Sequence, residues 1–363
     1  MTTIDFVINQ HKLNQSKFIQ KTMGPLKEGQ ILLKTSRFAF TANNITYAVA
    51  GFNLGYWKFF PSTEKNWGII PVWGFGEVIE SNVESIAKGE RFYGYFPMSS
   101  HIVMEPGKIS ERGFLDIISH RQSMATIYNY YTNIQADPGY SPEGESYQCL
   151  FRPLFTTSFL IDDFFAEKDF FGAKQIILTS SSSKTAYSLA FLLALRKKQE
   201  QKDISFIGLT SGRNLDFVKG LGFYDQVISY DELESQLSKE TNSAIIDFTG
   251  NHNLQYQLQT HLNDQLKYNC LVGLTDWTHM QGEQKLPKKG DFFFAPTIAQ
   301  QRTKEWGIAE FQKRLGHSWM LLNKNLMTWF EVNHNTGETL IQQTYQDMLV
   351  GKVNPRKGEI LNF

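Results

Sequence analysis

The chain is poor in cysteine and carries no net charge. Its 363 residues include two cysteines, Cys149 and Cys270, which excludes a disulfide scaffold and a four-cysteine zinc lobe. Lys and Arg together number 36, as do Asp and Glu, whereas a chain built to bind nucleic acid or an anionic membrane is usually basic. We therefore expect neither nucleic acid nor a membrane as a partner.

Long hydrophobic runs are also missing. No stretch of about 18 consecutive apolar residues occurs, which predicts that no helix crosses a membrane. Residues 1–10 are polar and mixed, without a basic start and an apolar centre, so they do not resemble a secretory signal. Together with the few cysteines, these features favour a cytoplasmic protein.

Apolar and aromatic residues are plentiful. Hydrophobic residues make up 41% of the chain and aromatic residues 14%, which is enough to bury large cores and excludes wholesale disorder. At roughly 150 residues per domain, this length predicts two domains. The aromatic residues are expected in the cores, with a dimer interface as a further place for some of them.

The first 150 residues show the pattern of short strands joined by turns. Residues 30–37 alternate loosely between apolar and polar, as a half-buried strand does. Residues 68–80 and 91–97 are apolar or aromatic stretches punctuated by glycine and proline. This part of the chain predicts a β-rich domain.

From about Phe170 onward, strands and helices alternate. Apolar runs predict strands at residues 175–180, 204–209, 226–229, 244–248 and 269–274. Helical patterns lie between them at residues 184–198, 214–221, 231–239 and 253–266. Such alternation is typical of a doubly wound parallel sheet. Helices are predicted over 302–332 and 338–350, and a last strand over 358–362.

Several stretches, in this order, resemble the medium-chain dehydrogenase/reductase superfamily. They are LKEGQILLKTSRFAFTANNITYAVAG (26–51), VWGFGEVIES (72–81), AKGERFYGYFP (87–97), LFTTSFLIDDFF (154–165), GLGFYDQVISYDE (220–232) and IIDFTGN (245–251). The most similar branch is that of zinc-independent quinone oxidoreductases and enoyl reductases. The serine run at 180–183 and residues 292–307 are also similar to an uncharacterised bacterial subfamily.

The resemblance implies an α/β fold with two domains. The first is a β-rich, GroES-like catalytic domain over residues 1–150 and 335–363, to which the chain returns at its C-terminal end. The second is a Rossmann-type, doubly wound nucleotide-binding domain over residues 151–334. A nicotinamide cofactor, a small-molecule substrate and a homodimer are family-level expectations.

The loop after the first predicted Rossmann strand departs from the family pattern. Relatives carry glycines here, so that the backbone approaches the pyrophosphate, whereas this loop has none. We predict that it still holds phosphate at a helix start, with a lysine adding charge. The residues assigned to this role are Ser180, Ser181, Ser182, Ser183, Lys184 and Thr185. The alternative is an ordinary serine-capped helix, and a P-loop is disfavoured because both its glycines are missing.

The second Rossmann strand predicts which cofactor is preferred. NAD-binding relatives place an acidic residue at the end of this strand, but here the first one is Asp216 on the following helix. Ser211 and Arg213 suit a 2′-phosphate, because arginine pairs with phosphate in a bidentate manner. The chain therefore predicts NADP(H), with a solvated Arg213 as the alternative.

Further site residues follow from the resemblance. Tyr47 falls where quinone reductases often place a tyrosine that faces the nicotinamide, and Asn43 or Asn44 would orient the substrate. The alternatives are a structural tyrosine and a turn. Positions expected beside the cofactor are Thr157, Thr249, Gly250 and Thr275.

No metal site is expected. Residues 41–51 contain neither Cys nor His, and Val72 and Trp73 stand where zinc-dependent relatives have a His-Glu pair. We therefore predict a zinc-free, NADP(H)-dependent oxidoreductase that transfers hydride to or from a quinone, an activated alkene or a carbonyl compound. The alternative is a nucleotide-binding sensor or scaffold that keeps the fold without the chemistry.

Overall fold

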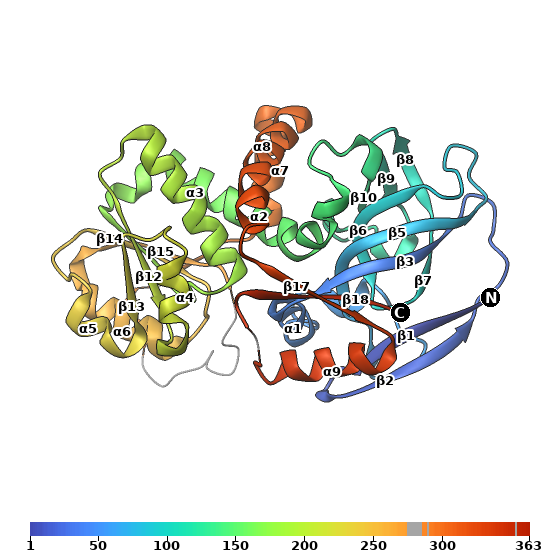
Figure 1. The fold of residues 1–363 in the computed structure, drawn as a ribbon, viewed down its shortest axis with the longest axis horizontal. Coiled ribbons are helices and arrows are strands. Elements are labelled where there is room, and N and C mark those ends of the chain that lie inside the picture. The colour runs from blue at the N-terminus through green and yellow to red at the C-terminus, as the bar shows by residue number, and fades with distance from the viewer. Residues whose placement is uncertain (274–284, 289, 353) are drawn as a thin grey trace. The chain divides into compact units, whose positions relative to one another are not determined.

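The computed structural model describes residues 1–273, 285–288, 290–352 and 354–363 (Figure 1). The chain forms two compact units: unit 1 comprises Met1–Leu150 and Met327–Phe363, and unit 2 comprises Phe151–Leu326. The last part of unit 1 begins earlier than the predicted residue 335. The reason is that strand β17 (Glu331–Thr336) pairs with β18 (Lys357–Asn362) in a sheet of unit 1.

Unit 1 is β-rich, as the sequence predicts. Its other strands are β1 (Thr2–Asn9), β2 (Lys12–Thr22), β3 (Ile31–Phe40), β4 (Trp67–Gly68), β5 (Pro71–Ser81), β6 (Arg91–Pro97), β7 (His101–Met104), β8 (Pro106–Ser110), β9 (Gly113–Asp116) and β10 (Tyr130–Asn133). One sheet has the order β2-β1-β4. A nine-stranded sheet has the order β17-β18-β3-β5-β6-β10-β9-β8, with β7 paired to β3. The helices α1 (Ala42–Val49) and α9 (Glu338–Leu349) complete the unit.

Aromatic side chains fill the core of unit 1. Phe6, Phe38 and Tyr95 are completely buried, together with Tyr131. Gly94 in β6 makes room for the Tyr131 ring of β10, since a Cβ atom at this glycine would lie 2.4 Å from the ring. The packing of β6 against β10 therefore requires a residue without a side chain here.

Unit 2 contains a six-stranded parallel sheet. Its strands are β11 (Gln175–Leu178), β12 (Ser205–Thr210), β13 (Gln226–Ser229), β14 (Ser243–Asp247), β15 (Leu266–Leu271) and β16 (Asp291–Phe292). They pair in the order β13-β12-β11-β14-β15-β16, and every pairing is parallel. Numbered from β11, this is the order 3-2-1-4-5-6 of a Rossmann fold. The predicted fold class is therefore confirmed.

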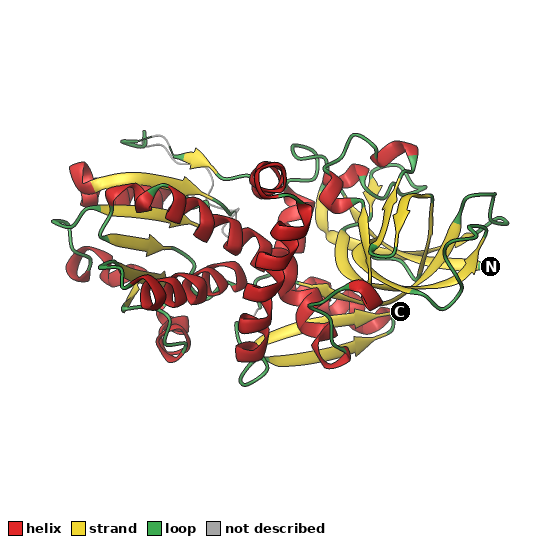
Figure 2. Ribbon diagram, turned by 90° about the horizontal axis from the view of Figure 1, so that it is seen from above, coloured by secondary structure: helices red, strands yellow, loops and turns green. Residues whose placement is uncertain are grey.

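Helices cover both faces of this sheet (Figure 2). The helices in this part of the chain are α2 (Glu145–Glu167), which contains the boundary between the units, α3 (Lys184–Glu200), α4 (Leu215–Gly220), α5 (Leu233–Gln236), α6 (His252–Leu262), α7 (Ala295–Trp306) and α8 (Ile308–Leu326). Both faces of a central strand are then buried, which explains the apolar run of residues 176–178 in β11.

The predicted helix over 302–332 is confirmed over residues 302–306 and 308–326, but it is two helices and it ends earlier. Helix α7 begins earlier, at Ala295, and ends at Gly307, whose φ of 82° lies in the left-handed region. Helix α8 then continues to Leu326, and residues 331–336 form strand β17. Gly316 remains inside α8, because a glycine with a helical backbone costs only about 1 kcal/mol relative to alanine.

Candidate functional site

The serine loop joins the carboxyl end of β11 to the start of α3. Ser183 is the N-cap of α3, and its hydroxyl accepts a hydrogen bond from the amide of Ala186. The predicted helix start is therefore present. The amides of Lys184 and Thr185 lie in the first helical turn, where a helix offers no acceptors of its own. Such a turn favours a negatively charged ligand.

Two of the serines are bonded within unit 2. Ser180 has a φ of 49°, in the left-handed region that usually favours glycine, and its amide donates to the Tyr230 hydroxyl at 2.9 Å. Ser181 is completely buried; its amide donates to the Leu209 carbonyl at 3.0 Å and its hydroxyl to the Leu178 carbonyl at 2.8 Å. These serines shape the loop, and the left-handed turn is made without glycine.

The remaining loop residues lie closer to the surface. The Ser182 hydroxyl accepts a hydrogen bond of 3.0 Å from the Asn214 side chain, which links the loop to the segment after β12. The Lys184 ammonium lies 5.9 Å from the centre of the Phe151 ring. The Thr185 carbonyl accepts from the Ser158 hydroxyl of α2 at 2.8 Å. Thr157, the neighbour of Ser158, is half-buried on the same helix.

The end of β12 places Ser211 and Arg213 in a short turn next to this loop. Ser211 is half-buried and precedes a single helical turn, Gly212–Asn214, while Arg213 is exposed. Because the Asn214 side chain bonds Ser182, the β12 turn and the serine loop are tied together. The structure thus brings these two predicted parts of the cofactor site to one edge of the sheet.

Asp247 is a residue that the sequence analysis missed. It ends β14, is 1% exposed, and accepts hydrogen bonds from the Thr179 hydroxyl at 2.6 Å and the Thr249 hydroxyl at 2.7 Å. The amides of Thr249 and Gly250 also donate to it, at 3.0 and 3.2 Å. The carboxylate therefore joins the carboxyl ends of β11 and β14. An acidic residue closing an apolar run, followed by Phe-Thr-Gly, was the available signal.

The bonds to Asp247 give two predicted cofactor residues a local role. The hydroxyl of Thr249 is directed to the carboxylate, and Gly250 has a φ of 67° in the turn that follows. Both positions hold the turn between β14 and α6. Thr275 lies outside the described residues.

The predicted catalytic residues lie on α1 in unit 1. The half-buried Asn43 and the buried Tyr47 are one turn apart, while Asn44 is structural: it caps the helix start at Thr41 and donates to the Pro71 carbonyl at 3.0 Å. Burial raises the pKa of the Tyr47 phenol, and the neighbouring Tyr56 adds to this effect. Tyr47 is therefore protonated at physiological pH and can donate a hydrogen bond.

Tyr47 belongs to a cluster of aromatic side chains. Its ring stacks on Tyr56 at 4.3 Å and meets Tyr95 edge-on at 6.0 Å. Trp73 and Tyr128 lie 5.0 and 4.9 Å from Tyr95, measured between ring centres. We call these five residues the tyrosine cluster.

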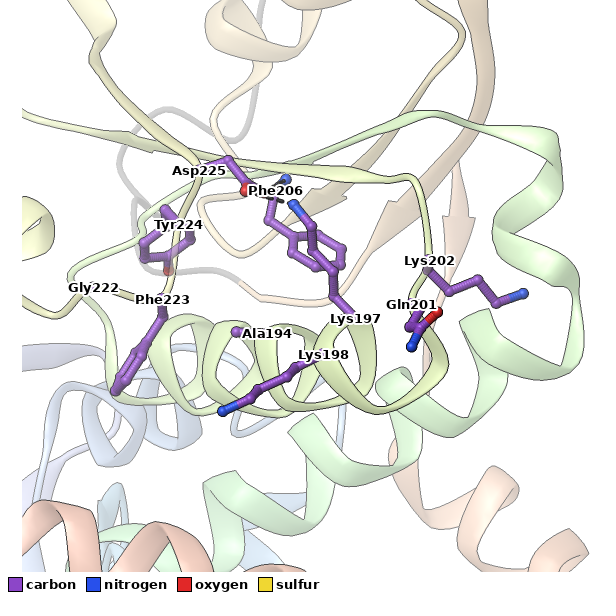
Figure 3. A pocket seen from close by; sticks show the side chains of 10 residues that line it. All are labelled: Ala194, Lys197, Lys198, Gln201, Lys202, Phe206, Gly222, Phe223, Tyr224 and Asp225. Carbon is purple, nitrogen blue, oxygen red and sulfur yellow. Dashed lines mark hydrogen bonds and ion pairs between the residues drawn. The ribbon is translucent and has the colours of Figure 1, made fainter.

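A pocket of about 500 Å³ lies elsewhere in unit 2 (Figure 3). It is formed by the C-terminal end of α3 and the start of β12, whereas ligands of doubly wound sheets bind at the carboxyl ends of the strands. Lys197 pairs with Asp225 at 2.5 Å. Figure 3 shows the ammonium groups of Lys197, Lys198 and Lys202 pointing in different directions, so they form no common anion site.

Within the described ranges, no group of three or more His, Cys, Asp or Glu side chains has the geometry to hold a metal ion. Across the same part of the chain, none of the helices combines the length and the apolar character needed to cross a bilayer.

The β-rich unit and the 3-2-1-4-5-6 sheet form a fold that several solved reductase structures share. CurA from Vibrio vulnificus, solved with NADPH, has a TM-score of 0.61 and 13% identity, covering 99% of this chain and 98% of that one. A mutant form of an enoyl thioester reductase from Candida tropicalis has a TM-score of 0.60 and 13% sequence identity, and the match covers 100% of both chains. The quinone oxidoreductase from Coxiella burnetii has a TM-score of 0.55 and 15% sequence identity, and the match covers 99% of each chain.

The family of the chain is also defined. Residues 38–354 match the family described as "Protein of unknown function (DUF2855)", and the chain belongs to it. No curated protein matches the chain. The predicted resemblance to the superfamily and to an uncharacterised subfamily is thus confirmed.

Proposed function

We propose that this protein is an NADP(H)-dependent oxidoreductase. The observation that carries the proposal is the serine loop: it leads from the first strand of a Rossmann sheet into the N-terminus of α3, beside the turn with Ser211 and Arg213. Similarly folded proteins support it, since CurA was solved with NADPH, and another protein of this fold, named Etr1p, was solved with NADP and crotonyl-CoA.

In unit 2, the serine loop would hold a dinucleotide phosphate differently from the glycine-rich loop of relatives. The first turn of α3 supplies amides from Lys184 and Thr185, and Lys184 adds a positive charge. Ser180 and Ser181 use their amides within the protein, so their part is to hold the loop in shape. Ser182 and Ser183 present hydroxyl groups beside the same turn.

The choice of NADP(H) over NAD(H) rests on charge. Arg213 is exposed at the end of β12, where a guanidinium can pair with a 2′-phosphate, and Ser211 adds a hydroxyl. Thr157, Thr249, Gly250 and Thr275 complete the proposed cofactor set.

When bound, NADPH supplies a hydride for an electrophilic carbon of the substrate, and a proton from water completes the reduction. The part of Tyr47 is to donate a hydrogen bond to a substrate oxygen that gains negative charge, because its raised pKa keeps the phenol protonated. Asn43, one turn away on α1, orients the same group. A quinone, an activated alkene or a carbonyl compound would be the substrate, and a zinc ion takes no part.

A second candidate is a nucleotide-binding sensor without catalysis. The amides of Ser180 and Ser181 are already bonded within the protein, which favours weaker or altered cofactor binding. A cytoplasmic homodimer belongs to either proposal.

The test has two measurements on the wild-type protein. NADPH should bind in a fluorescence titration, and its absorbance should then decrease when a panel of quinones and enones is added. Binding without turnover on any acceptor would favour the sensor, and absence of binding would refute both.

A further inference from the structure

Two hydrogen-bond donors in the tyrosine cluster have no partner. The Tyr95 hydroxyl is completely buried and the indole Nε1 of Trp73 is also inaccessible, yet neither makes a hydrogen bond within the part of the chain that the structure describes. A buried donor without a partner is destabilising, so such groups usually bind a ligand or an ordered water.

Both donors lie beside the Tyr47 hydroxyl. The side chains of Trp73, Asn43 and Tyr95 lower the pKa of the Tyr47 phenol, whereas Tyr56 raises it. They come from three elements: β5 carries Trp73, β6 carries Tyr95, and α1 carries Tyr47. The fold therefore gathers an indole N–H and two phenol O–H groups in one place.

The backbone of Tyr95 is held by a hydrogen-bond network. The Tyr131 hydroxyl donates to the Tyr95 carbonyl and accepts from the Arg121 guanidinium at 3.1 Å, and Arg121 is paired with the buried Asp116. This network holds the β6 backbone at Tyr95. The Tyr95 hydroxyl is left for another partner.

The chemistry of these three donor groups indicates which kind of ligand atom they would bind. An indole N–H only donates, so the ligand atom must be an acceptor. The main electrostatic neighbours of Tyr47, Tyr95 and Tyr128 are other tyrosines, and the nearby Arg121 is already paired with Asp116, which disfavours an anion. A neutral oxygen is therefore favoured over a carboxylate.

The surrounding surface favours a flat ligand. Tyr56 and Phe59 add further aromatic faces around Tyr95 and Tyr47, at 5.2 Å from Tyr95 in the case of Phe59. Trp73 and Tyr128 are only half-buried, so the cluster reaches the protein surface. Flat rings pack on aromatic faces in offset or edge-on arrangements.

We propose that the Trp73 indole N–H and the Tyr95 hydroxyl, together with Tyr47, bind the neutral carbonyl oxygen of a planar conjugated substrate. The part given to Tyr47 rests on the proposed function. Trp73 and Tyr95 would then determine specificity, because they distinguish a ketone or quinone from a carboxylate of the same shape.

The test compares acetophenone with ethylbenzene, which has a similar shape but no acceptor. The wild-type protein should bind acetophenone at least about tenfold more tightly, measured by ligand-observed NMR without cofactor. Tyr95→Phe and Trp73→Phe should each reduce acetophenone affinity by about tenfold and leave ethylbenzene affinity within twofold. The melting temperature of unliganded Tyr95→Phe should stay equal or rise, because a buried unpartnered hydroxyl is removed.

Tyr128→Phe is the matched control. Its hydroxyl pairs with that of Tyr56 at 3.4 Å, so acetophenone affinity should change less than in Tyr95→Phe. The inference is overturned if the wild type does not prefer acetophenone, or if both Tyr95→Phe and Trp73→Phe keep that preference. NADPH titration is independent of this readout: loss of NADPH binding alone refutes the proposed function and leaves the carbonyl site standing.

Discussion

The exposed position of Arg213 determines how strongly NADPH should be preferred over NADH. A desolvated arginine–phosphate pair is worth roughly 1.5–3 kcal/mol, but an exposed ion pair contributes only about 1 kcal/mol or less. Since Arg213 is exposed, we expect the smaller value, which corresponds to roughly fivefold tighter binding of NADPH. The Ser211 hydroxyl would add little, because it competes with water.

Salt should reduce this preference. The screening length falls from about 10 Å at 0.1 M ionic strength to about 3 Å at 1 M. The ratio of NADH to NADPH dissociation constants should therefore decrease from roughly five to below about two. Neutral contacts with the rest of the dinucleotide should change much less.

The assay is a nicotinamide fluorescence titration with both cofactors at two salt concentrations. Arg213→Ala should remove most of the preference and leave NADH affinity nearly unchanged, whereas Arg213→Lys should keep part of it. Lys219→Ala removes another exposed cation in unit 2 and serves as the control. Equal affinities in the wild type, or the same loss in Lys219→Ala, would refute the argument.

Three further predictions concern the loops and metal content. Lys184→Ala should weaken NADPH binding by about 1–3 kcal/mol without unfolding the protein, as titration and melting would show; unchanged affinity would leave the serine loop as a plain helix cap. Asp247→Asn should lower the melting temperature by roughly 5 °C, because an amide nitrogen would face donors that now meet a carboxylate, whereas the exposed control Asp264→Asn should change it little. Elemental analysis of untagged protein should find well under one zinc per chain, and a stoichiometric, chelator-resistant zinc would contradict the zinc-free assignment.

Local sequence patterns were sufficient where a residue's own neighbours in the chain decide its conformation. The run QIILTS followed by serines predicted strand β11 and the capped start of α3, because apolar runs and N-caps act within a few residues. Likewise, Gly222 follows the helix that ends near Gly220, as a left-handed stop does.

Only the tertiary structure decided where distant residues meet. Asp247 receives the Thr179 hydroxyl from another strand, and β17 is defined by its pairing with β18; neither partner is near in sequence. The tyrosine cluster likewise needs α1, β5 and β6 to pack before Trp73 and Tyr95 face Tyr47. Periodicity predicts which side of an element is buried, but the partners across a core depend on chain topology, which short-range patterns do not contain.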